Sequence, residues 1–137
     1  MATKQFGTAA EYAAALKEAM RDASGKQIDL LRAHCVAPKK TTTWSSLAEE
    51  VGYKNFRAVN LHYGALAHRV GTILGRARPP EGFWLFVLVH WADRREPLSD
   101  HTQFVLRPQV IDALRLLGYS WADGKRSDRL KPNSRRR

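Results

Sequence analysis

Apolar residues in the central part of the chain recur at helical spacing. The first stripe is Trp44, Leu47, Ala48 and Val51, at positions i, i+3, i+4 and i+7. After Gly52 and a short turn, a second stripe runs to Gly75 through Phe56, Val59, Tyr63, Leu66, Ala67, Val70, Ile73 and Leu74. Thr43 and Asn55 precede the two stripes, and both residue types cap helix N-termini. The pattern predicts a helix-turn-helix unit over residues 43–75.

The flanking segments predict further helices and short strands. Helical spacing covers residues 8–23, 26–35 and 108–117, and residues 39–43 read as a strand or a turn. The apolar run Phe83–Trp91 predicts a central strand, residues 92–101 an exposed connection or hairpin loop, and Phe104 and Val105 a short paired strand. We therefore expect one domain over residues 1–124, an α+β fold that is mainly helical. Its expected centre is a winged helix-turn-helix-like core with a short antiparallel sheet or hairpin.

Charge is unevenly distributed along the 137 residues. The formal net charge is +10, with 23 Lys and Arg against 13 Asp and Glu. Residues 39–78 carry +5 and residues 125–137 carry +6, whereas the rest of the chain sums to −1. With one apolar residue in thirteen, the segment 125–137 is expected to be a disordered basic tail. Because one basic region coincides with the predicted helix-turn-helix, a polyanionic partner is expected.

Other classes of protein are disfavoured by what the sequence lacks. Cys35 is the single cysteine, the N-terminus does not resemble a secretory signal, and no apolar run approaches the length of a membrane span. The five histidines do not follow zinc-ligand spacing, and no catalytic carboxylate pair, phosphate loop or nucleophile triad is recognisable. We therefore expect an intracellular, cytoplasmic protein without metal, cofactor or catalytic activity, nucleoid-associated if it is bacterial.

The second helix of a helix-turn-helix can enter the major groove of DNA, with residues near its N-terminus on the base edges. Arginine pairs with guanine and asparagine with adenine, whereas lysines, hydroxyls and helix N-termini meet phosphates. The predicted base or groove readers are Lys54, Asn55, Arg57 and Asn60, and the predicted phosphate contacts are Lys39, Lys40, Thr42, Thr43 and Ser45. His68 and Arg69, further along the second helix, complete the predicted DNA-binding set.

A family resemblance accompanies these residues. It rests on Pro38, Thr42, Thr43, Trp44, Leu47, Ala48, Val51, Gly52, Arg57, Ala58, Val59, Asn60, Gly64 and Leu66. This string, spanning about thirty residues, resembles the winged helix-turn-helix of the alkylguanine-DNA alkyltransferase and alkyltransferase-like family. In that family an arginine, matched here by Arg57, enters the minor groove and takes the space of a nucleotide extruded from the duplex. The family's Pro-Cys-His-Arg motif is absent. Residues 37–71 also resemble, more loosely, accessory DNA-binding modules found beside HNH nucleases in restriction-like proteins.

Three alternatives to plain duplex binding stay open. Trp84 and Trp91 could wall a pocket for an extruded or modified base, since aromatic rings hold unpaired bases, although such residues are more often core. A base-modifying or damage-sensing enzyme would use the same pocket. A small protein-interaction module, or a regulator of a nucleic-acid enzyme, would use the helices as a docking scaffold. The favoured interpretation is a non-catalytic protein that binds duplex DNA.

Overall fold

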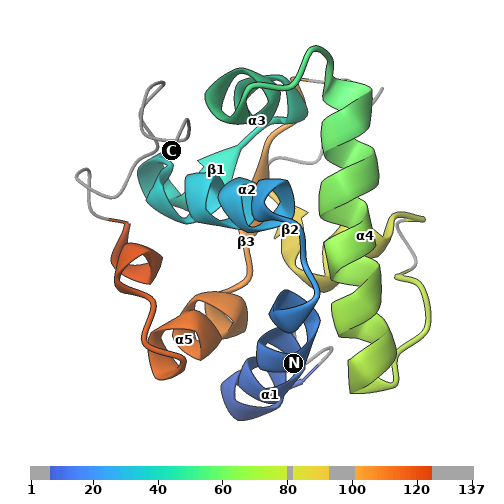
Figure 1. The fold of residues 1–137 in the computed structure, drawn as a ribbon, viewed down its shortest axis with the longest axis vertical. Helices are drawn as coiled ribbons and strands as arrows, with labels where there is room; N and C mark the ends of the chain where they lie inside the picture. The colour runs from blue at the N-terminus through green and yellow to red at the C-terminus, as the bar shows by residue number, and fades with distance from the viewer. Residues whose placement is uncertain (1–6, 80–81, 93–100, 125–137) are drawn as a thin grey trace.

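The computed structural model describes residues 7–79, 82–92 and 101–124, and Figure 1 shows helices gathered around a small sheet. The α-helices are α1 (Ala9–Arg21), α2 (Gly25–Val36), α3 (Trp44–Val51), α4 (Phe56–Leu74) and α5 (Pro108–Leu116). The strands are β1 (Thr41–Thr42), β2 (Val89–Trp91) and β3 (Phe104–Leu106), and short 3-10 turns are η2 (Pro38–Lys40), η3 (Trp84–Val87) and η4 (Ser120–Asp123). The predicted α+β, mainly helical class is confirmed. The predicted tail at 125–137 and most of the connection at 92–101 lie outside the described residues.

Capping residues set the ends of α3 and α4 where the sequence places them. Thr43 Oγ1 accepts a hydrogen bond from the backbone N–H three residues later at 3.0 Å, and Asn55 Oδ1 does the same at 3.1 Å. Gly52 and Gly75 follow the two helices with φ of 93° and 75°, a region that favours glycine. The predicted boundaries of both helices are confirmed.

The sheet joins segments that lie far apart in the sequence. Its three antiparallel strands are ordered β1-β3-β2, so β3 is central. Phe104 of β3 pairs with Thr42 on one side and with Trp91 on the other. The sequence predicts a strand or a turn over residues 39–43, and the structure has both. The turn η2 ends at Lys40, and the strand β1 follows it directly.

The prediction of one central strand over Phe83–Trp91 is wrong. Only Val89–Trp91 is a strand, and it lies at the sheet edge, whereas Trp84–Val87 form the 3-10 turn η3. Side chains from outside the sheet bind the carbonyls of this turn. The Arg107 guanidinium donates to Phe86 O from Nε at 3.0 Å and from Nη2 at 2.8 Å, and the Tyr12 hydroxyl donates to Val87 O. A short, continuous apolar run carries no period that separates strand from turn.

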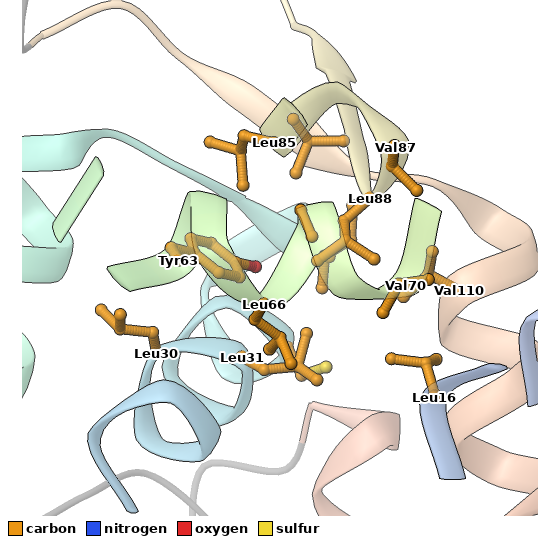
Figure 2. Packing of buried hydrophobic residues seen from close by; sticks show 14 of the residues in the cluster. Leu16, Leu30, Leu31, Tyr63, Leu66, Val70, Leu85, Val87, Leu88 and Val110 are labelled. Atoms are coloured by element: carbon orange, nitrogen blue, oxygen red, sulfur yellow. The ribbon is translucent and has the colours of Figure 1, made fainter. Parts of the chain in front are cut away.

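The core lies where α4 crosses the remaining elements. Figure 2 shows side chains from α1, α2, α4, α5 and the η3 segment meeting in one cluster. Its labelled members are Leu16, Leu30, Leu31, Tyr63, Leu66, Val70, Leu85, Val87, Leu88 and Val110, all of them buried. One side of α4 is thus fixed by packing, and this determines which side faces solvent.

Gly71 lets η3 approach α4 closely. A Cβ at this position would lie 2.8 Å from a ring carbon of Trp84 and 3.1 Å from a methyl carbon of Val87. Gly64, two turns earlier in the same helix, has no heavy atom within 4 Å of the corresponding point. Internal packing therefore explains Gly71 but not Gly64.

A buried histidine joins α2, α4 and β3. His34 Nε2 lies 3.3 Å from Phe104 O, and Nδ1 lies 2.7 Å from the Tyr63 hydroxyl oxygen. Because a carbonyl only accepts, Nε2 carries the proton and Nδ1 accepts the hydrogen bond from Tyr63. The ring also makes edge contacts with both aromatic neighbours. Burial lowers the pKa of His34 to about 3 and raises that of Tyr63.

Burial of His34 predicts a loss of stability in mild acid. In the unfolded chain its pKa is about 6.5. The contribution of His34 to the free energy of unfolding is therefore complete above this pH. It is lost as pH falls from about 6.5 toward 3, because in this range only the unfolded state takes up a proton at this residue. We expect this residue to lower the free energy of unfolding by about 1 kcal/mol per pH unit between pH 6 and 4, measured by denaturant titration. His34→Gln, which keeps one donor and one acceptor, should lack this component. Tyr63→Phe should keep it, and equal slopes in all three proteins would contradict the assignment.

Gly71→Ala should destabilise the protein by about 1–3 kcal/mol, because the added methyl group overlaps the Trp84 ring. The matched substitution in the same helix is Gly64→Ala, which meets open space and should add about 0.5–1 kcal/mol through higher helix propensity. Chemical denaturation of both variants measures these effects. The same sign of change in both would show that the two glycines do not differ in packing.

Candidate nucleic-acid interface

Contacts with α2 hold the helix-turn-helix unit in place. Lys26 Nζ donates to Val51 O, the last residue of α3, at 2.9 Å, and lies 5.0 Å from the centre of the Tyr53 ring in the turn. Gln27 Nε2 donates to His62 O of α4 at 3.0 Å. The N-terminal turn of α2 therefore fixes both the end of α3 and the first half of α4.

One side of α4 faces solvent along its first three turns. We define the α4 face as Arg57, Asn60, Leu61, Gly64, Ala65 and His68, which are exposed or half-buried. The opposite side consists of Val59, Tyr63, Leu66, Ala67 and Val70, which are buried. Three of the predicted DNA-binding residues, Arg57, Asn60 and His68, thus share one helix face.

The α4 face lies in a positive environment. Lys54 precedes the helix, Arg57 is in its first turn, and Arg69 follows His68 at the border of the face; all three side chains are exposed. None of the three has a hydrogen-bond or ion-pair partner within the described part of the chain. The sequence from Gly52 to Pro80 contains no Asp or Glu. These charges are therefore not neutralised by neighbours along the chain.

A hollow runs along the α4 face, between this helix and η3. Its volume is about 330 Å³, and its lining is Asn60, Leu61, Gly64, Ala65, His68, Gly82, Phe83, Trp84 and Leu85. Leu61 is 68% exposed at its border, and Gly64 and Ala65 contribute almost no side-chain volume. A positively charged helix face thus includes an apolar surface that another molecule can reach.

Trp84 and Trp91 do not form one base pocket. The Trp84 ring stacks on His68 of the α4 face, with ring centres 4.1 Å apart and planes 14° apart. Trp91 lies against Phe86, with ring centres 4.4 Å apart, and it does not line the hollow beside Trp84. Each indole thus already has an aromatic neighbour from the protein. Trp84 and His68 together form one end of the hollow.

The predicted phosphate contacts at the start of α3 are mostly engaged within the protein. Thr42 is buried in β1, and the Thr43 hydroxyl oxygen accepts the capping hydrogen bond of α3. Ser45 is half-buried. The neighbouring hollow of about 460 Å³ is also lined by Glu49 and Glu50. Two carboxylates at its border make it an unfavourable place for phosphate.

The adjacent lysines Lys39 and Lys40 have different environments. Both have left-handed backbones, with φ of 56° and 57°. Lys40 Nζ donates to Cys35 O at the end of α2, at 2.7 Å, and to Ala122 O of η4, at 3.1 Å. Lys39 is exposed. The charge of Lys40 therefore joins α2 to η4, whereas that of Lys39 faces solvent.

Cys35 does not provide a nucleophile at neutral pH. It is buried, and burial raises the pKa of its thiol to about 12, so the thiol remains protonated. Within residues 7–79, 82–92 and 101–124, no group of three or more His, Cys, Asp and Glu side chains could hold a metal ion. The helices of these segments are all too short or too polar to cross a membrane.

Sequence reasoning missed three residues of the α4 face, namely Leu61, Gly64 and Ala65. Leu61 lies between Val59 and Tyr63 in the sequence, outside the apolar stripe that both belong to. A leucine off the stripe of an amphipathic helix is the signal that indicates an exposed apolar contact. Gly64 gives no comparable signal, because a helical glycine can equally reflect close internal packing, as Gly71 does.

Comparisons with protein-family models, with curated proteins and with solved structures find no match for this chain.

Proposed function

We propose that this protein binds duplex DNA without catalysing a reaction, and that it does so with the α4 face. The observation that carries the proposal is the concentration of Lys54, Arg57 and Arg69 around an exposed helix face that follows a helix-turn connection. Duplex DNA presents phosphates to such cations and base edges to the side chains between them. In this arrangement α4 lies in the major groove while α3 crosses the backbone.

The order of the elements supports a winged helix-turn-helix as the finer description of the fold. In such a unit a short strand lies between the first and second helices and pairs with a hairpin that follows the third. Here β1 lies between α2 and α3, β2 and β3 follow α4, and β1 pairs with β3. On this basis α2, α3 and α4 correspond to the three helices. The additions α1 and α5 lie below them in Figure 1, with α1 packed against α4 and α5 packed against α1.

The roles follow from position on α4. Arg57 and Asn60 are one turn apart near the N-terminus of the helix and are the proposed readers of base edges. Asn55 uses its side-chain oxygen for the cap, so its NH₂ group is the part that can donate outward. Lys54 and Arg69 flank the face and are the proposed phosphate contacts. Lys40 and Thr42 have no role in this proposal.

Replacing Arg57 by alanine should weaken binding to duplex DNA by about ten-fold, because one contact to a base edge or phosphate is lost. The matched control is Lys17→Ala, which removes one exposed positive charge from α1. In Figure 1, α1 lies near the C-terminal end of α4, whereas the α3–α4 turn lies at its N-terminal end. The measurement is fluorescence anisotropy with a labelled duplex at two salt concentrations, since phosphate contacts make affinity fall with salt.

Two results would contradict the proposal. Equal loss of affinity in Arg57→Ala and Lys17→Ala would mean that only net charge attracts the DNA. No salt-sensitive retention of any duplex by the parent chain would favour the alternative of a protein-interaction module.

Gly64→Leu should stabilise the protein while weakening DNA binding at least ten-fold. Leucine has a higher helix propensity than glycine, by about 0.5–1 kcal/mol, and a Cβ at this position meets open space. The longer side chain would separate α4 from the floor of the DNA groove. Thermal unfolding and anisotropy on the same sample measure the two effects. Unchanged affinity would mean that this face of α4 does not approach DNA.

A further inference from the structure

Leu61 is the most exposed large apolar side chain in the described part of the chain, at 68%. It lies one helical turn after Arg57, so the two side chains point from the same face of α4. Leu116 of α5 is exposed to nearly the same extent, at 66%, but Leu116 does not line the hollow between α4 and η3. Isolated surface leucines are common in proteins. The surroundings of Leu61 are what distinguish it.

The hollow beside Leu61 extends its apolar surface. Ala65 and Phe83 also line it, and Gly64 leaves its floor open to an approaching group. The flanking groups are cationic, namely Arg57 one turn before Leu61 and Arg69 two turns after it. A ligand that matches this surface carries anionic groups at its edges and a small apolar group between them.

The major groove of DNA combines these two properties. Its phosphates lie along both sides, and the one apolar group on its base edges is the 5-methyl of thymine. A protein partner would need an acidic rim around an apolar projection of similar size, and the experiment below distinguishes such a partner from DNA. We infer that Leu61 and the hollow beside it read the methyl group of a thymine, so that the protein prefers duplexes with thymine at a fixed position. This inference rests on the proposed binding of duplex DNA by α4.

The test first selects duplexes from a randomised pool with the full-length parent protein. Each thymine of the selected duplex is then replaced singly by deoxyuridine, which removes the 5-methyl group and leaves the base pairing and the hydrogen-bonding groups unchanged. At one position we expect the replacement to weaken binding by the parent roughly four-fold, the effect of withdrawing one buried methyl group from apolar contact. Leu61→Ala should bind the thymine and uracil duplexes equally.

Leu116→Ala is the matched control, because it removes an equally exposed leucine from another helix and should keep the four-fold difference. If the parent binds thymine and uracil duplexes equally, or if Leu61→Ala keeps the difference, the inference is overturned while duplex binding by α4 stands. If no duplex is enriched or retained, the proposed function itself is wrong. That result would favour the alternative of a protein-interaction module.

Discussion

The orientation of α4 depends on the His34 ring, which has one donor and one acceptor and finds a partner for each. The donor is fixed by the Phe104 carbonyl of the sheet, so the acceptor must face the Tyr63 hydroxyl of α4. A rotation of α4 would break this pair in a fully buried place, where an unpaired polar group costs about 1–3 kcal/mol. The apolar packing of α4 and this chain of hydrogen bonds therefore select the same rotation of the helix. Because the rotation of α4 about its axis is fixed, the set of residues on its solvent-facing side is fixed as well.

The helices were predictable from the sequence because their signals are local. Thr43, Asn55, Gly52 and Gly75 each act within a few residues, and the apolar stripe of α4 needs no knowledge of its partners. The η3 segment was not predictable in the same way. Its conformation depends on Arg107 and Tyr12, which come from distant parts of the sequence and satisfy its carbonyls. The residues next to Phe83–Trp91 in the sequence do not reveal these contacts.

The candidate site was predictable in its charges and less so in its shape. The clustering of Lys54, Arg57 and Arg69 is visible in the sequence, since no acidic residue interrupts it. Whether each cation reaches solvent depends on tertiary contacts, which the sequence does not show. The ammonium group of Lys40, for example, is bound by two backbone carbonyls of the protein itself. The hollow beside Leu61 also needs the fold, because Phe83 and Trp84 reach α4 only through the turn that the sequence did not predict.

The first and last helices of the described chain pack against each other, and α1 also packs against α4. Contacts between segments so far apart in the sequence close a long loop, so we expect them to form late in folding. The α3–α4 pair needs only neighbouring residues and can form early. During synthesis, we expect the apolar side of α1 to be covered in part once α4 has emerged from the ribosome, and completely only after α5 has emerged. We therefore expect α3 and α4 to be in place before α1, which precedes them in the sequence, is fully covered.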